Sequence, residues 1–282
     1  MDDQIECSLL VEAAEADLAD PIAAAHWARS RLGLRQDEPV RDLCGLLESR
    51  GIKVLLFDIQ SDGFFGLSVS AADLGGPAVV VNTWQDLSVE RQIFTAAHEL
   101  GHLLLHRDDY DGGGEVRDEE EVSEREADLF AAHFLMPDEV FAKEWEATRG
   151  LDPVDRILKV KRMFRVSYKT VLRRLADRQP DPELRQQIWP YFFKRWRQRY
   201  QHSLGKRDEP FAVRLKEFKA GASETWRREE KETLSPVDFQ EDRLPSLVRQ
   251  AVETGEISIS RGAEILGRDL EDMKSLAASW TL

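Results

Sequence analysis

The sequence predicts an α+β fold, with a small sheet among helices in the front half and a mostly helical C-terminal half. Three short runs rich in apolar and β-branched residues lie between residues 52 and 81, which indicates three strands. Apolar residues recur at helical spacing on both sides of these runs. Beyond Pro153 every patterned segment has the helical period, so we expect the strands to be confined to the front half.

The elements of the front half follow one another without an internal repeat. Residues 1–20 are acidic and rich in alanine, so we expect them to be frayed or loosely helical. Ser88 can cap a long helix that runs to about His106, and Pro137 ends a second strongly patterned helix. An acidic loop, residues 107–121, joins these two helices. The remaining predicted elements are helices over 22–32, 40–47 and 124–136 and strands over 52–57, 64–69 and 78–81.

The C-terminal half is predicted to contain helices separated by one long polar segment. Helices over 157–164 and 168–176, with a short break between them, resemble a helix–turn–helix. A helix over 184–200 interleaves aromatic with basic side chains, and residues 203–242 are polar enough to predict a flexible linker. A small helical unit follows, with helices over 244–252, 260–266 and 270–278.

The composition excludes a membrane protein and favours the cytoplasm. No apolar stretch approaches the ~18–20 residues that span a bilayer, and the acidic start is unlike a secretion signal. Only two cysteines are present, Cys7 and Cys44, so a disulfide scaffold is not expected in a chain of 282 residues. We therefore expect a cytoplasmic protein.

The net charge of −14 is unevenly distributed along the chain. Residues 1–150 carry 12 basic and 32 acidic side chains, whereas residues 151–207 carry 16 basic and 5 acidic ones. The acidic front half argues against nucleic-acid binding, but the basic block at 151–207 leaves DNA open as a partner. The alternatives for these bases are solvation and docking against the acidic front half.

The strongest chemical signal is the pentapeptide His98-Glu99-Leu100-Gly101-His102, inside the predicted long helix. Two histidines four residues apart differ by only ~40° around a helix, so both imidazoles can bind one metal ion. Glu99 lies ~100° from His98, within reach of a water on that metal. This H-E-x-x-H arrangement of zinc peptidases predicts one Zn²⁺ per chain and Glu99 as the catalytic base. The alternative is a pair of surface histidines that bind no metal.

A catalytic zinc ion needs a third protein ligand, which we expect on the next helix. His106 lies ~12 Å along the helix axis from His98, so it cannot easily join the same ion. On the wheel of the next helix, Glu126 lies among apolar positions, Glu124 at their margin and Asp128 on the polar side. A carboxylate among core side chains needs a partner, so we predict Glu126 as the third ligand. The alternative is a buried carboxylate paired with arginine or with the backbone.

Two segments carry a resemblance to a known family. Phe94 to His106, which contains H-E-x-x-H, and Glu126 to Pro137 (EADLFAAHFLMP) are similar to the ImmA/IrrE family of zinc metallopeptidases. The resemblance covers about residues 20–178 and leaves 180–282 unassigned. It implies a zincin-like domain that cleaves a helix–turn–helix repressor or another regulator. Some members of the family are linked to toxin–antitoxin pairs or mobile elements.

The predicted organisation is therefore a zincin-like metallopeptidase domain followed by helical regions. The domain spans 1–150, a basic helix–turn–helix-like region 151–202, the linker 203–242 and the small helical unit 243–282. The first hypothesis is a zinc endopeptidase that cleaves a regulatory protein such as a repressor or an antitoxin. The alternative is a toxin–antitoxin or transcription-regulatory component that binds a protein partner or DNA through its helical half.

The group that stabilises the oxyanion is not specified by the sequence. Candidates for this role, or for a supporting role around the metal, are His106, Tyr110, His133 and Tyr168. For each of them the alternative is a purely structural role. The strand over 79–82 is a candidate for pairing with an extended substrate, with an ordinary core strand as its alternative.

Overall fold

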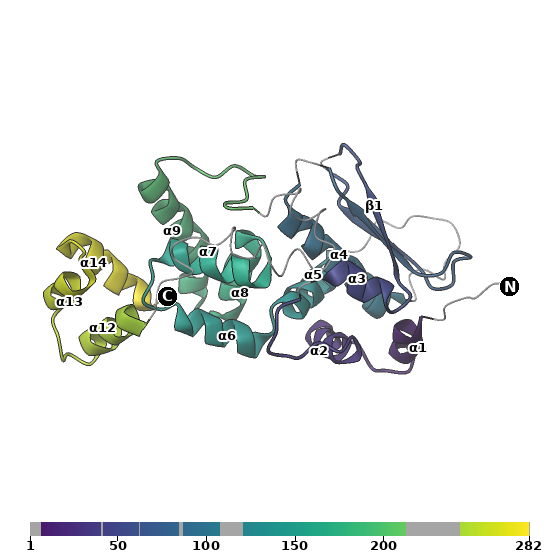
Figure 1. Cartoon of the computed structure of the whole chain (residues 1–282), viewed down its shortest axis with the longest axis horizontal. Helices are drawn as coiled ribbons and strands as arrows, with labels where there is room; N and C mark the ends of the chain where they lie inside the picture. Colours follow the sequence, from purple (N-terminus) through teal and green to yellow (C-terminus); the bar gives the residue numbers. More distant parts are fainter. Residues whose placement is uncertain are drawn as a thin grey trace. The chain divides into compact units, whose positions relative to one another are not determined.

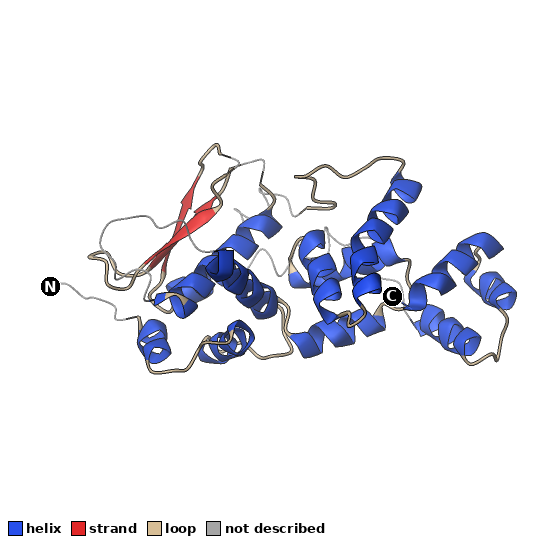
Figure 2. Cartoon of the chain, turned by 180° about the vertical axis from the view of Figure 1, so that it is seen from behind, coloured by secondary structure: helices blue, strands red, loops and turns tan. Residues whose placement is uncertain are grey.

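The computed structural model confirms the predicted α+β class (Figure 1, Figure 2). It describes residues 7–40, 42–61, 63–84, 87–107, 121–212 and 243–281. The contacts within the chain divide it into two units, one that reaches to Val140 and one that begins at Phe141. The boundary thus lies about ten residues before the predicted one, because α6 (Asp138–Ala147), a helix that the sequence analysis missed, continues into the second unit.

The first unit contains every element that the sequence predicted for the front half, with ends that differ by a few residues. Within the segment expected to be frayed or loosely helical, residues 8–14 form α1, whose Leu9 and Leu10 are buried. Ser88 caps α4 as predicted, because its hydroxyl accepts a hydrogen bond from the backbone N–H of Arg91. The elements are α1 (Ser8–Ala14), α2 (Pro21–Arg31), α3 (Leu43–Glu48), β1 (Lys53–Phe57), β2 (Gly66–Val69), β3 (Ala78–Asn82), α4 (Val89–Leu105) and α5 (Glu121–Leu135).

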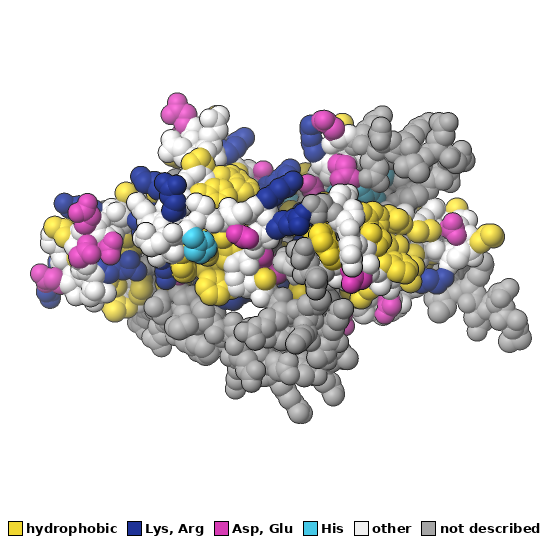
Figure 3. Space-filling view, turned by 90° about the horizontal axis from the view of Figure 1, so that it is seen from above, with side chains coloured by type: hydrophobic (Ala, Val, Ile, Leu, Met, Phe, Trp, Pro, Cys, Tyr) yellow, Lys and Arg dark blue, Asp and Glu magenta, His cyan; other side chains and the backbone are white. Residues whose placement is uncertain are grey.

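The sheet has the strand order β1-β3-β2, with β3 parallel to β1 and antiparallel to β2. Every residue of β3 is buried, as expected of a central strand with neighbours on both sides. Helix α4 packs against β2 and β3 and covers one face of the sheet. The other face carries Leu55 and Leu67, which flank Val80 in register and are each 42% exposed. Figure 3 shows apolar side chains gathered at the surface over the sheet.

Asn82 ends β3 and fastens the connection between β1 and β2. The side chain is fully buried, and its Oδ1 accepts hydrogen bonds from the backbone N–H groups of Ile59 and Trp84. Its Nδ2 donates to the carbonyl oxygens of Ile59 and Phe64, at 2.7 and 2.8 Å. One amide therefore satisfies four buried or half-buried backbone groups around the sheet.

Replacement of this amide should destabilise the first unit. We expect Asn82→Ala to lower the free energy of unfolding by about 3 kcal/mol, because several backbone groups lose their partners in a site that water does not fill. Denaturant unfolding measures the loss. Asn82→Asp places a buried carboxylate oxygen against the carbonyl oxygens that Nδ2 now contacts, so it should destabilise the unit at least as much; an unchanged midpoint in both variants would contradict this role.

Helices α4 and α5 form the most extensive contact between described helices of the first unit, and a glycine lies in it. A Cβ atom at Gly101 would lie 3.1 Å from the Phe130 ring and 3.3 Å from the Cα of Ala127. Such contacts are tighter than ordinary van der Waals packing, so any larger residue would push the helices apart. The glycine inside H-E-x-x-H therefore sets the separation between α4 and the helix that follows it.

The second unit is helical, as predicted. Tyr168 begins α8, and its ring stacks on Phe192 of α9 with centroids 5.3 Å apart. The last three helices enclose their own small core, formed by Val248, Ala263, Met273, Leu276 and Trp280. None of the helices described in either unit is both long and apolar enough to span a membrane. The helices after α6 are α7 (Pro153–Phe164), α8 (Tyr168–Arg178), α9 (Pro182–Tyr200), α12 (Arg243–Glu253), α13 (Ile259–Leu266) and α14 (Leu270–Ala278), with a final 3-10 turn, η3 (Ser279–Thr281).

Part of the predicted linker is packed. Lys161 of α7 is fully buried, and its Nζ lies 2.9 Å from the Oε1 of Glu209. The same ammonium donates a hydrogen bond of 2.8 Å to the carbonyl oxygen of Pro210. Residues 203–212 are thus held against α7 and α8, and residues 213–242 of the predicted linker lie outside the described residues.

Candidate metal centre

The two histidines of H-E-x-x-H point the same way from α4. His98 and His102 lie one turn apart, and their Nε2 atoms are 3.0 Å from each other. Both side chains are largely shielded, with exposed fractions of 12% and 4%. If both Nε2 atoms are unprotonated, their lone pairs repel each other at this distance. A metal ion bound by both nitrogens would remove that repulsion.

Helix α5 adds Glu124 to the pair. Its Oε2 lies 3.4 Å from the Nε2 of His98, and its Oε1 lies 3.4 Å from the Nε2 of His102. One ligand atom from each of the three residues lies within 4.8 Å of the other two. The carboxylate is 46% exposed, so it reaches the histidines from the open side.

These donors fit a zinc ion. Tetrahedral zinc with ligand bonds of ~2.0–2.1 Å places neighbouring ligand atoms ~3.3 Å apart. The observed separations of 3.0 and 3.4 Å bracket that value. Two neutral imidazoles and one carboxylate are also the donor set of a catalytic site that keeps its fourth position open.

Glu126, which the sequence analysis selected as the third ligand, lies elsewhere. Its Oε2 is 3.0 Å from the Nε2 of His106, and Glu124 takes the place beside the histidine pair. The helical wheel ranked carboxylates by how apolar their surroundings are, and that criterion selected Glu126 rather than the carboxylate that lies beside the histidine pair. Glu124 lies at the margin of the apolar arc of α5, and from there its carboxylate reaches the histidines of α4.

The outer ring nitrogens of the histidines have partners that fix their orientation. The Nδ1 of His98 is 3.1 Å from the Oδ1 of Asp128. The Nδ1 of His102 is 2.9 Å from the Nδ1 of His106, whose Nε2 contacts Glu126. If both Nε2 atoms of the pair bind a metal, each Nδ1 carries a proton. The Nδ1–H of His102 then donates to the Nδ1 of His106, and the Nε2–H of His106 donates to Glu126.

The sequence analysis gave Asp128 no role. Its spacing of four residues from Glu124 nevertheless predicts that both carboxylates lie on the same face of α5. Residues four apart share a helix face, so the two carboxylates flank His98 from one side. The balance of charges around His98 reflects this. Burial lowers its pKa, but the hydrogen bond to Asp128 and the charges of Glu99 and Glu124 outweigh burial and raise the pKa above its ordinary value.

Glu99 lies between the histidine pair in sequence and faces β2 in space. Only 6% of its surface is exposed. A Cβ atom at Gly66 would lie 3.0 Å from the Oε1 of Glu99, so the carboxylate rests against the bare backbone of this strand. In the described sheet β2 has β3 on one side and no strand on the other, so it is an edge strand, and Glu99 lies over the face that α4 covers. Of the two alternatives for the strand over 79–82, the structure favours the core strand over pairing with a substrate, because β1 and β2 occupy both edges of β3.

Of the residues that the sequence offered for oxyanion stabilisation or support of the metal, only His106 contacts this centre among the described residues. His106 is part of the centre through its contact with His102. His133 is buried, and its Nδ1 contacts Asp138 at the start of α6. Tyr168 is 1% exposed in the second unit, where burial, and secondarily the charge of Glu209, raises the pKa of its phenol to about 12. Tyr110 lies outside the described residues.

The bases that suggested DNA binding are partly withdrawn from the surface. Lys161, Arg165 and Arg174 are 0%, 8% and 1% exposed. Arg195 of α9 pairs with Asp152, which precedes α7, at 2.5 Å, and Arg199 of α9 pairs with Asp155 of α7 at 2.6 Å. On the face in Figure 3, Lys and Arg side chains are interspersed with acidic and apolar ones. The charge count of 151–207 therefore overstates the surface open to phosphates, and DNA binding stays a prediction.

A comparison with protein-family models covers the part of the chain that contains the histidine pair. Residues 47–176 match the family model Peptidase_M78, described as an IrrE N-terminal-like domain. Among solved structures, a Mycobacterium tuberculosis transcriptional regulator is similar, with 22% sequence identity and a TM-score of 0.41. The similarity covers 63% of this chain and 53% of that protein, so it spans about half of the regulator's length. A comparison with curated proteins gave no match.

Proposed function

Because residues 47–176 form an IrrE N-terminal-like domain of the Peptidase_M78 family, we propose that this metallopeptidase-like domain is a zinc-dependent endopeptidase. Its substrate would be a regulatory protein such as a helix–turn–helix repressor or an antitoxin. The observation that supports the proposal is the convergence of His98, His102 and Glu124 one residue away from a buried Glu99. A scaffold that only bound metal would have no use for this carboxylate.

His98, His102 and Glu124 would hold the ion. Bound zinc would lower the pKa of a water and polarise the carbonyl of the scissile peptide bond. Asp128 would keep the Nδ1 of His98 protonated, so that Nε2 presents its lone pair to the site. The pair of His106 and Glu126 would do the same for His102.

Glu99 would serve as the general base and then as the general acid. Its carboxylate would take the proton from the attacking water and deliver it to the nitrogen of the leaving amine. Burial keeps the carboxylate away from bulk solvent, so the proton stays within the site between the two steps.

An extended substrate would pair with the free edge of β2. Strand addition supplies backbone hydrogen bonds without regard to sequence and lays the peptide along the strand beside Glu99. Gly66 allows the backbone of this strand to approach Glu99 and Thr95 closely, because a side chain there would overlap both. The substrate path would therefore run along β2 rather than along β3.

A methyl group at position 66 tests this close approach. In Gly66→Ala the Cβ would lie 2.5 Å from the Cγ2 of Thr95 and 2.6 Å from the carbonyl oxygen of Val80, so the strand must shift. We expect cleavage to fall by about 10-fold or more and unfolding free energy to drop by about 1–3 kcal/mol, with zinc content unchanged. The matched control is Gly63→Ala, where the added Cβ meets nothing within 4 Å. Equal behaviour of the two variants would contradict the role given to Gly66.

The proposed activity is tested with the full chain against a broad set of substrates. The purified protein is loaded with zinc, its metal content is measured, and it is incubated with a library of unstructured peptides and with repressors encoded beside its gene. New termini found by mass spectrometry, and abolished by a zinc chelator, are the expected result. Bound zinc without cleavage, together with DNA binding that weakens steeply with salt, would instead favour the regulatory alternative.

A further inference from the structure

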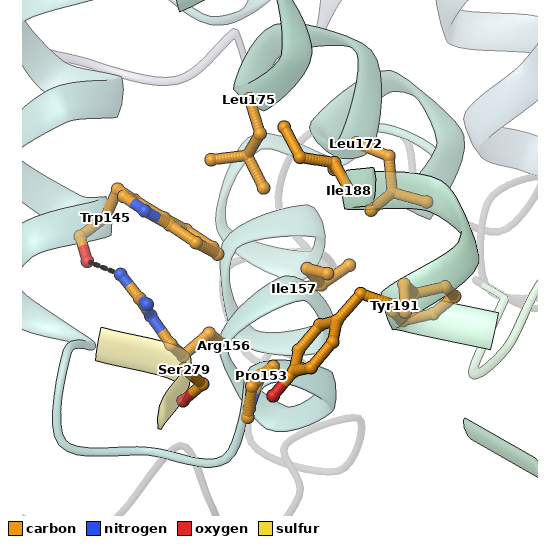
Figure 4. Close-up of a pocket in the computed structure, with 10 residues that line it drawn as sticks. Trp145, Pro153, Arg156, Ile157, Leu172, Leu175, Ile188, Tyr191 and Ser279 are labelled. Atoms are coloured by element: carbon orange, nitrogen blue, oxygen red, sulfur yellow. Dashed lines mark hydrogen bonds between the residues drawn. The ribbon is translucent and has the colours of Figure 1, made fainter. Parts of the chain in front are cut away.

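The second unit contains a small, partly open pocket, with a cavity volume of about 40 Å³, that the proposed peptidase activity does not use (Figure 4). Its walls come from five elements. Trp145 lies on α6, Ile157 on α7, Leu172 on α8 and Tyr191 on α9, and Ser279 belongs to the last turn of the chain. The walls are almost entirely apolar, as is typical of pockets that bind small organic molecules.

One charged side chain, Arg156, lines this apolar pocket. It is 3% exposed, and its Nη2 donates a hydrogen bond of 2.9 Å to the carbonyl oxygen of Trp145. The guanidinium carbon lies 3.7 Å above the centre of the Trp145 ring. The Nε–H is buried and has no hydrogen-bond partner. Among the described residues, no carboxylate forms an ion pair with this guanidinium.

The charges nearby do not compensate for the burial. Desolvation, and then repulsion from Arg249 and Arg149, lowers the pKa of Arg156 to about 9, and the attraction of Glu146 only partly opposes this. Removal of a guanidinium from water without an anion beside it is costly, and a hydrophobic residue of similar size would be the more stable choice. The position therefore carries a charge that the fold itself leaves uncompensated.

We propose that the pocket binds a small carboxylic acid with an apolar body, whose carboxylate pairs with Arg156. The planar guanidinium matches a carboxylate, whose two oxygens accept parallel N–H donors. A phosphate has more charge and more acceptor oxygens than one guanidinium satisfies, and the excess would face apolar walls. The aromatic and aliphatic walls select a hydrocarbon part of aryl or branched alkyl type. Tyr191 and Ser279 add hydroxyl groups to the remaining wall, and the Ser279 hydroxyl donates a hydrogen bond of 2.6 Å to the carbonyl oxygen of Leu276.

Calorimetric titration of the full chain with phenylacetate and with its neutral amide, phenylacetamide, tests the charge requirement. Because a buried hydrogen bond to a charged group is lost with the amide, phenylacetate should bind at least about 10-fold more tightly. Acetate, which lacks the apolar body, should bind more weakly than phenylacetate. Equal affinity for the acid and the amide, or no binding of either, would overturn the proposal.

Variants separate a binding role of Arg156 from a structural one. Arg156→Met should abolish the preference for the acid while the free protein unfolds at the same or a higher temperature. Arg149→Met is the matched control, since Arg149 is a nearby surface residue paired with Glu146, and it should keep the preference. Leu175→Trp, which fills the pocket and leaves Arg156 in place, should block the acid as well. A lower unfolding temperature in Arg156→Met, with the acid preference retained, would show that the arginine only anchors the Trp145 carbonyl.

Discussion

A Glu99→Gln variant should bind zinc as the wild type does and cleave its substrate about 10³-fold more slowly. The amide has the size and shape of the carboxylate but cannot take a proton from water. The ligand atoms of His98, His102 and Glu124 are left untouched, so the loss should appear in kcat while metal content remains at one zinc per chain. Cleavage at the wild-type rate by a zinc-loaded variant would rule out the general-base assignment.

The control for Glu99→Gln removes a carboxylate of the same type away from the histidines. Glu121, in the first turn of α5, is 88% exposed and pairs only with Arg125 across the helix surface. Glu121→Gln should therefore leave zinc content and cleavage unchanged, because such exposed pairs contribute little. A loss of activity in this variant would mean that the charge of the acidic surface, rather than Glu99 itself, controls the rate.

Truncation of Glu124 and of Glu126 should have clearly different effects on zinc affinity. Glu124→Ala removes a donor atom, and we expect the affinity to fall by more than about 100-fold. Glu126→Ala removes only the partner of His106, and losses of that kind are ~10–100-fold. Competition with a chromophoric chelator measures both.

The two variants share a helix and differ by two residues, so each is the other's control for folding. Circular dichroism should show the same helix content for both. If Glu126→Ala lost zinc and Glu124→Ala retained it, the wheel argument would be correct and the observed contacts of Glu124 would be incidental.

The sequence was sufficient to predict that the two histidines of H-E-x-x-H lie side by side, because this depends on local structure alone. His98 and His102 share one helix, and helical geometry alone brings them together. The third residue depends on how α5 crosses α4, which neither wheel contains. Gly101, Ala127 and Phe130 set that crossing through their packing, and packing between helices cannot be computed from the periodicity of either helix.

The same distinction explains the other departures from prediction. The strand over 79–82 was recognised, but its place in the centre of the sheet depends on pairing with β1 and β2, which periodicity does not reveal. The basic residues around 151–207 were counted correctly, whereas the burial of Lys161 and Arg174 follows from tertiary contacts. Arg156 looked like one base among many, and only its burial in an apolar pocket distinguishes it.

The position of Glu124 in the first turn of α5 couples the metal to local unfolding of that helix. Helix ends open more easily than helix centres, and each opening would carry this carboxylate away from the histidines. Bound zinc would therefore stabilise the first turn of α5 against local unfolding. In hydrogen–deuterium exchange, amides near the start of α5 should exchange more slowly once zinc is added, while those around Phe130 should hardly change. The fraction of molecules in which Glu124 lies beside the histidines would then depend on the metal concentration, because metal binding stabilises that state.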